Sequence, residues 1–83
     1  MKTKALTQKE LFNLLTSGVE VFLYYEFEDA CVRLKLVKGG HAVYNSHTKF
    51  KGETEFPTRP GSSILDAVFY DPIQISEDDY LNF

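Results

Sequence analysis

The first clear pattern along the chain is a helix signal near the N-terminus. Thr7 stands three residues before Glu10 in a T-x-x-E capping box, and leucines occupy both positions of a hydrophobic staple around it. Apolar residues then recur at helical spacing as Leu11, Leu14 and Leu15. Gly18 suits the left-handed position that ends many helices. The pattern predicts a short helix between Thr7 and Gly18.

From Val19 to Phe27 the apolar period changes to two, which is typical of a strand. The odd-numbered positions are all aliphatic or aromatic, so we expect them to face the core. The even-numbered positions are mixed, and Phe22 and Tyr24 among them are the best candidates for an exposed aromatic patch. This segment is the first long strand that we predict.

Two further strands are predicted in the middle of the chain. Between residues 31 and 37, apolar positions alternate with Arg33 and Lys35, which places these cations on the outer face. Gly39-Gly40 fits a two-residue hairpin turn, because glycine adopts positive φ without steric cost. A third strand is expected from residue 41 to 46, and its end is left open between Ser46 and Phe50. These strands would form an antiparallel meander.

The last third of the chain gives weaker signals. Residues 51–63 hold two prolines and two glycines and are expected to form a long loop. Residues 63–71 fit either a helix or a strand, and the run Val68-Phe69-Tyr70 favours the strand. Ile73 and Ile75 alternate as a short edge strand, and Ser76 is placed to cap a final helical turn.

These elements predict the α+β class, with an N-terminal helix packed on an antiparallel sheet of about four to five strands. Residues 1–83 would form a single small α+β domain. A chain of 83 residues supports one thin core, which disfavours a deep catalytic cavity. No segment reaches the roughly 18–20 apolar residues of a membrane span. A single cysteine, Cys31, cannot form an internal disulfide, which favours a cytoplasmic location.

Aromatic residues make up 14% of the chain, which is more than the predicted core uses. The group assigned to the core is Phe12, Tyr25, Phe27, Phe50 and Phe69. The group without a predicted core position is Phe22, Tyr24, Phe56, Tyr80 and Phe83. The second group either packs back over the sheet or provides a contact surface for a protein partner or a second copy of the chain.

Charge is distributed unevenly around a net charge of −3. Residues 30–59 carry six basic and two acidic residues, whereas residues 60–83 carry five acidic residues and no basic one. The basic segment, residues 30–59, contains the predicted hairpin. It either pairs with the acidic segment, residues 60–83, or orients a partner. Its bases also interleave with aromatic residues, an arrangement that binds single-stranded nucleic acid. The acidic net charge and the lack of a nucleic-acid-binding motif make that function the alternative.

The sequence contains few residues of the types that form catalytic or metal sites. His41 and His47 would lie about 20 Å apart on one extended strand, too far to share an ion. Ser46 and His47 are neighbours that would point to opposite faces, and Cys31 is expected to be a packed residue. No phosphate-binding loop is present. We therefore predict a non-enzymatic chain with no catalytic residue, no metal and no cofactor.

The layout of the two ends of the chain resembles that of small phage-encoded domains. The capping-box helix, Gly18, the strand start Val19-Glu20-Val21 and the ending Glu77-Asp78-Asp79-Tyr80 carry this likeness. One family with this layout is the Thoeris anti-defence proteins, which sequester a cyclic nucleotide signal. The resemblance implies, as a third possibility, binding of a small nucleotide ligand.

The first hypothesis for function is a protein-binding domain, such as a small inhibitor or adaptor encoded by a phage or another mobile element. Its contact surface would combine the aromatic face of the first strand, the basic hairpin and the long loop. The predicted partner-binding residues are Phe22, Tyr24, Arg33, Lys35, Lys38, Tyr44, Phe56 and Arg59.

Overall fold

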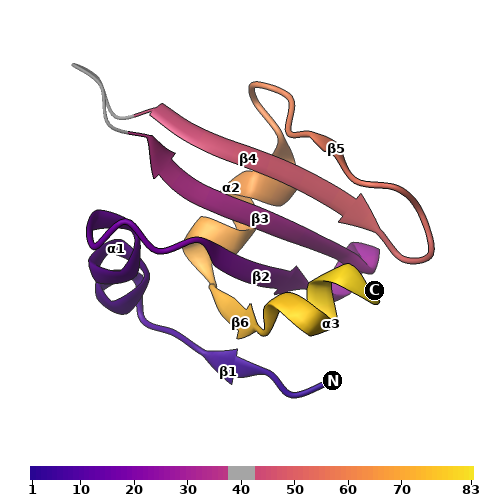
Figure 1. Cartoon of the computed structure of the whole chain (residues 1–83), viewed down its shortest axis with the longest axis horizontal. Coiled ribbons are helices and arrows are strands. Elements are labelled where there is room, and N and C mark those ends of the chain that lie inside the picture. The colour runs from indigo at the N-terminus through magenta and orange to yellow at the C-terminus, as the bar shows by residue number, and fades with distance from the viewer. Residues whose placement is uncertain (38–42) are drawn as a thin grey trace.

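The structure, a computed structural model, describes residues 1–37 and 43–83 (Figure 1). The helices and strands in these residues are β1 (Lys4–Ala5), α1 (Gln8–Thr16), β2 (Val21–Tyr25), β3 (Ala30–Val37), β4 (Val43–Phe50), β5 (Phe56–Pro57), α2 (Ser63–Tyr70), β6 (Ile73–Ile75) and α3 (Glu77–Leu81). A turn of 3₁₀-helix, η1 (Glu26–Glu28), joins β2 to β3. The predicted α+β class is confirmed. The predicted Gly39-Gly40 turn lies outside the described residues.

Helix α1 begins at the predicted cap. The Thr7 hydroxyl accepts a hydrogen bond from the Glu10 backbone N–H at 3.1 Å, and the Glu10 carboxylate accepts one from the Thr7 N–H at 3.0 Å. The bond from the Thr7 N–H, and next the Thr7 side chain, lower the pKa of the Glu10 carboxyl. The helix ends before Gly18, whose φ of 87° is the left-handed value expected there. The capping box and the helix stop are therefore both confirmed.

The strands form one antiparallel sheet in the order β1-β6-β2-β3-β4-β5 (Figure 1). β3 and β4 pair from Ala30 opposite Phe50 to Val37 opposite Val43, which confirms the predicted hairpin over its described part. β6 pairs with β1 on one side and β2 on the other, so the prediction that Ile73 and Ile75 form an edge strand is wrong. On this side of the sheet the edge is the two-residue strand β1, which is too short to leave a periodic signal.

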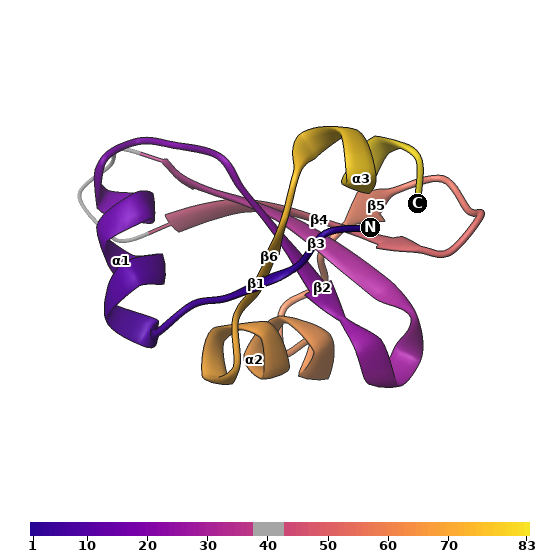
Figure 2. The same ribbon diagram turned by 90° about the horizontal axis from the view of Figure 1, so that it is seen from below.

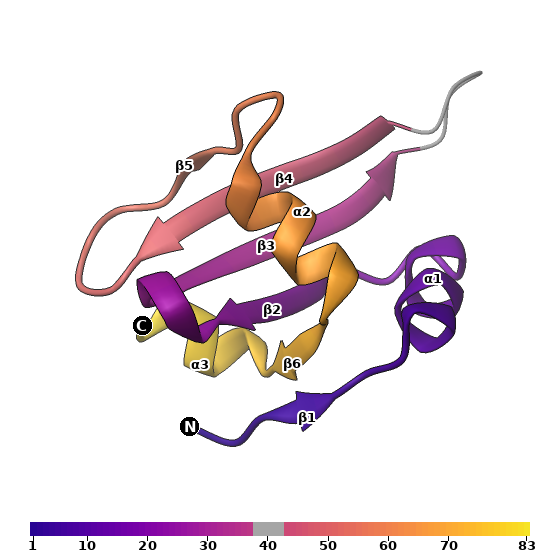
Figure 3. The same ribbon diagram turned by 180° about the vertical axis from the view of Figure 1, so that it is seen from behind.

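One face of the sheet packs against α1 and α2 (Figures 2 and 3). Val21 and Leu23 of β2 lie opposite Leu34 and Val32 of β3, and all four side chains are buried on this face. The helices add Leu11, Leu15, Ile64 and Val68 to this main core, and Leu6 joins it from the segment before α1. The odd-numbered face of β2 is therefore the core face, as the alternation predicts.

The opposite face carries α3, so the sheet lies between helices (Figure 2). Phe22, Cys31 and Ile75 are buried there together with Tyr80 of α3. Phe22 is only 8% exposed, and the prediction that the even face of β2 presents an exposed aromatic patch is wrong at this residue. Ser76 caps α3 as predicted, by accepting a hydrogen bond from the Asp79 N–H at 3.1 Å.

Residues 63–71 form a helix over most of their length, so the predicted strand is wrong. The Ser62 hydroxyl accepts a hydrogen bond from the Leu65 N–H at 3.2 Å and caps α2. Ile64 and Val68 stand one turn apart and are both buried against the sheet. The cap and this packing outweigh the strand propensity of the run that ends at Tyr70.

Two aromatic residues predicted for the core lie on the surface. Phe12 of α1 is 61% exposed, and Phe27 is 89% exposed. The alternation of β2 stops at Tyr25, because η1 turns the chain before Asp29 takes a left-handed φ of 46°. Val19, at the other end of the predicted strand, is also exposed. The predicted loop over residues 51–63 contains the short strand β5, which pairs with His47 and Thr48 of β4.

Candidate functional site

The first two predicted partner-binding residues are engaged by the C-terminal segment. The Phe22 ring lies 5.3 Å from the Tyr80 ring, measured between centroids. The Tyr24 ring meets the Phe83 ring edge-on at 5.7 Å, and the Tyr24 hydroxyl donates to the Asp29 carboxylate at 3.3 Å. Partial burial and this carboxylate raise the pKa of Tyr24. Both rings therefore serve to hold α3 and the C-terminal residues on the sheet.

The basic residues of the hairpin do share one face of the sheet. Arg33 lies opposite His47 and Cys31 opposite Lys49, so alternation places Arg33, Lys35, His47 and Lys49 together on the α3 side. Lys49 donates to the Leu81 carbonyl at 3.4 Å, and its Nζ lies 6.0 Å from the Phe83 ring centroid. Lys35 is exposed. Lys38 lies outside the described residues.

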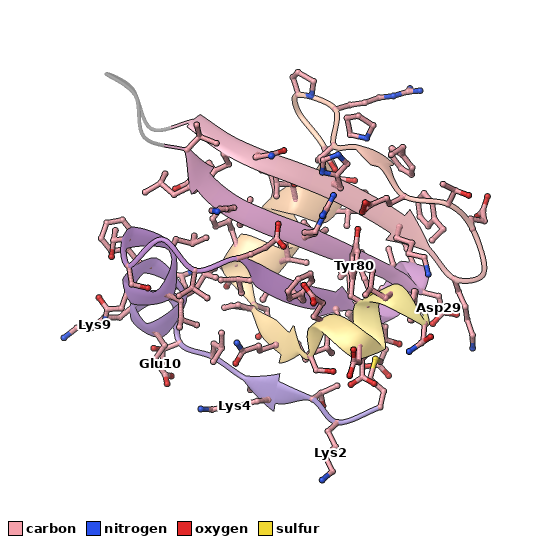
Figure 4. All side chains as sticks on the ribbon, viewed as in Figure 1. Lys2, Lys4, Lys9, Glu10, Asp29 and Tyr80 are labelled. Atoms are coloured by element: carbon pink, nitrogen blue, oxygen red, sulfur yellow. The ribbon has the colours of Figure 1, made fainter. Side chains whose placement is uncertain are left out.

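Arg33 belongs to a polar network that links β3, α3 and the segment before β5. Its Nη2 donates to Glu55 Oε1 at 2.7 Å, and the Tyr80 hydroxyl donates to Glu55 Oε2 at 2.7 Å. Figure 4 shows Tyr80 extending from α3 over the sheet. Burial, and next Glu55, raise the pKa of Tyr80. Glu20 also lies 3.9 Å from Arg33 Nε, so this guanidinium is balanced within the chain.

The aromatic residues of the hairpin point to the other side of the sheet from its cations. Tyr44 and Phe50 pack against the main core beneath α1 and α2. Phe56 pairs with Thr48 and stacks on Phe50 at 5.8 Å. Arg59 is exposed in the segment between β5 and α2. The sequence predicts that the hairpin mixes cations with stacking rings on one surface, but strand alternation places them on opposite faces. The predicted partner-binding residues of the described sheet are therefore divided between two faces.

A groove lies between α1 and α2 on the described surface. It encloses about 450 Å³, which lies within the size range of ligand pockets. The α1 wall consists of residues at helical spacing: Gln8, Leu11, Phe12 and Leu15. Leu11 and Leu15 are buried and form the floor, whereas Phe12 stands at the open rim. This arrangement gives the exposed ring of Phe12 a place in a binding surface.

The opposite wall comes from α2 and β4. Asp66, Phe69 and Tyr70 line it from one face of α2, at positions i, i+3 and i+4. Tyr44 of β4 completes it, with its ring 5.4 Å from that of Phe69 and tilted by 61°. Tyr70 is 81% exposed at the rim. Four aromatic rings therefore line the groove, and two of them, Phe12 and Tyr70, stand at its rim.

The groove is fixed by a contact between its two walls. The Gln8 side-chain amide donates to the Tyr70 backbone carbonyl at 3.2 Å and joins α1 to the end of α2. A second hollow of about 340 Å³ lies on the other side of Tyr70 and is lined in part by Glu26, Phe27 and Asp71. Tyr70 is therefore an aromatic ridge between two neighbouring hollows.

Acidic residues line both the groove and the second hollow. Asp66 lines the groove, and Glu26 and Asp71 line the second hollow, while no lysine, arginine or histidine lines either one among the described residues. In the described part of the chain, the Asp66 carboxylate makes no hydrogen bond or ion pair. The surface can therefore accept positive charge beside aromatic rings.

The described residues do not assemble groups typical of a catalytic or metal site. Cys31 is fully buried, and burial raises the pKa of its thiol to about 12, which makes it a poor nucleophile. Ser46 shares a hydrogen bond of 2.8 Å with Thr58, while the neighbouring His47 points to the other face. Within residues 1–37 and 43–83, no group of three His, Cys, Asp or Glu side chains is placed to hold a metal ion.

Sequence reasoning misses the groove because it places two of its residues elsewhere. Phe12 and Phe69 are predicted to be core residues, and residues 63–71 are predicted to be a strand. Reading Ser62 as a helix cap would place Asp66, Phe69 and Tyr70 on one helix face. Their meeting with Phe12 depends on how α1 and α2 pack on the sheet, for which the sequence carries no local signal.

No family model matches the chain, and no curated protein or solved structure is significantly similar to it. In the described part of the structure, none of the helices has the length and apolar character needed to cross a membrane.

Proposed function

We propose that this chain is a non-enzymatic protein-binding domain that receives its partner in the groove between α1 and α2. The observation that carries the proposal is the exposure of Phe12 and Tyr70, at 61% and 81%, on either side of an apolar floor. Neither ring is needed to bury the core, and exposed aromatic groups around a hollow are typical of protein interaction sites.

The expected role as a small inhibitor or adaptor, of the kind encoded by a phage or other mobile element, is retained as part of this proposal. A chain with a thin core and a preformed groove suits a protein that acts by occupying a partner's surface. The unpaired and buried Cys31 suits a reducing compartment, so the expected cytoplasmic location also belongs to the proposal.

Affinity capture with matched variants tests this function. We would compare the wild-type chain with a groove variant, Phe12→Ser combined with Tyr70→Ser, and with a far-face variant, Leu81→Ser. Leu81 is likewise an exposed apolar residue, but it lies on α3. Because all three residues are exposed, we expect circular dichroism to show the same fold for every variant.

Proteins captured by the wild type should be lost with the groove variant and retained with Leu81→Ser. Quantitative mass spectrometry of the captured proteins measures this difference. An unchanged set of captured proteins with the groove variant would refute the proposal.

Binding of single-stranded nucleic acid is the alternative, and the shared face of Arg33, Lys35, His47 and Lys49 favours it. Glu20 and Glu55 neutralise part of that face, and no hairpin aromatic residue among those described lies beside it. Salt-dependent binding of a single-stranded oligonucleotide that is lost in Lys35→Glu would establish this alternative in place of the groove.

A further inference from the structure

The groove between α1 and α2 has the features of a site for an organic cation. The Tyr44 and Phe69 rings of its wall lie 5.4 Å apart at 61°, in edge-to-face contact with each other. The faces of aromatic rings carry partial negative charge and attract ammonium and guanidinium groups. The carboxylate of Asp66 lines the same space and adds a full negative charge.

The charge of the surroundings points the same way. Asp66, Asp71 and Glu26 are distributed over the groove and the hollow beside it, and the described lining of both contains no base. Three lysines of the N-terminal region, Lys2, Lys4 and Lys9, stand at the periphery in Figure 4 and are absent from this lining. A partner that is complementary to this surface carries positive charge.

From these observations we infer that the groove binds a basic segment of the partner protein and holds one arginine or lysine side chain against the wall formed by Tyr44, Phe69 and Asp66. The inference rests on the proposed function and adds the chemistry of the partner. The aliphatic part of the inserted side chain contacts the floor of Leu11 and Leu15. Its cationic end pairs with Asp66, while flanking apolar residues of the partner cover Phe12 and Tyr70.

Burial of the Asp66 carboxylate would oppose an uncharged occupant. Covering Asp66 with an apolar segment would remove water from its carboxylate without giving it a counter-charge. A cation compensates that loss and also interacts with the rings, so charge adds specificity to an apolar groove. The inference is therefore tested by comparing a cationic occupant with an uncharged one of the same shape.

The test uses two tripeptides that differ only in charge. Acetyl-Leu-Arg-Leu-amide is titrated into the isotope-labelled full chain, and so is the same peptide with citrulline, the neutral isostere of arginine. We expect the arginine peptide to shift the side-chain NMR signals of Tyr44, Phe69 and Tyr70. The citrulline peptide should bind about fivefold to tenfold more weakly, since it loses both the ion pair and the cation–π contact.

Two isosteric variants locate the charge effect. Asp66→Asn keeps the shape of the groove and should weaken the arginine peptide by about threefold while leaving the citrulline peptide unchanged. Asp78→Asn removes the same charge from exposed α3 on the opposite face and should leave both affinities unchanged. Raising the salt concentration should weaken only the arginine peptide in the wild-type chain.

Equal affinity of the two peptides at the groove would overturn the inference and leave the proposed protein-binding function standing. Absence of any groove shift with the arginine peptide at millimolar concentration would also overturn it. The capture experiment with Phe12→Ser and Tyr70→Ser does not depend on these peptides, so the two ideas fail separately.

Discussion

Tyr80 is the residue through which we expect α3 to stabilise the sheet, and its replacement tests that role. The side chain is 1% exposed, packs on Phe22 at 5.3 Å and donates a hydrogen bond of 2.7 Å to Glu55. Tyr80→Phe removes only the hydroxyl. Tyr80→Ala removes the ring as well and leaves a cavity over Phe22 and Cys31.

The two variants should differ in size of effect. Glu55 keeps its bond to Arg33 and remains partly exposed, so loss of the hydroxyl should cost about 1.5 kcal/mol, at the low end for a bond to a charged group. That cost corresponds to a fall in melting temperature of about 6–12 °C for a chain of this size. Loss of the whole ring should cost about 3–5 kcal/mol, which is a large share of the stability of a small domain.

Urea unfolding followed by circular dichroism measures these free energies, with Leu81→Ala as the control. Leu81 neighbours Tyr80 on α3 but is exposed, so its replacement should change the free energy of unfolding by less than about 0.5 kcal/mol. Accessibility of the Cys31 thiol to a disulfide reagent gives a second measurement, because Tyr80→Ala should uncover it. A change below about 1 kcal/mol in Tyr80→Ala, with the thiol still protected, would refute the assigned role.

Three further predictions concern the Cys31 thiol, the Thr7 cap and the Glu10 carboxyl. Burial raises the pKa of Cys31 from its ordinary value of 9.0 to about 12 in the fold, so the stability contributed by the neutral thiol is complete below pH 9 and is lost between pH 9 and 12. Melting temperature should therefore fall less over this range in Cys31→Ala than in the wild type, and parallel curves would contradict the prediction. Thr7→Ala should lower the free energy of unfolding by about 1 kcal/mol in urea titrations. The Glu10 contribution is present above pH 4.5 and lost as pH falls through its lowered pKa, so acid sensitivity should decrease in Glu10→Gln, and an unchanged acid limb would count against the capping box.

Strand alternation predicts which face carries the cations of β3, but it does not predict which residues pair with them. Alternation correctly places Arg33 and Lys35 on one face of a strand. The linear sequence does not show that Glu20 and Glu55 reach Arg33, or that Tyr80 closes the same network. These contacts join segments distant along the chain, and they reduce the net positive charge of a surface that is basic in sequence.

The aromatic residues show where local reasoning fails. Phe27 follows the strand alternation of β2 in sequence, yet η1 begins one residue earlier and turns it into solvent. Phe22 occupies an outward position of the same strand, yet α3 covers it. In both cases the residue's exposure depends on the element that follows or covers the strand, rather than on the strand's own pattern.

Local patterns in the sequence are enough to predict the capped first helix, the alternating strands, the cap of α3 and the α+β class. Their signals lie within a few residues of one another, in hydrogen bonds of caps and in side-chain periodicity. Long-range packing, in contrast, makes β6 an inner strand, buries Phe22 under α3 and places Phe12 across a groove from Tyr70. These features arise because separate apolar faces must be buried together on one sheet, and only the packed chain determines which faces remain open to a partner.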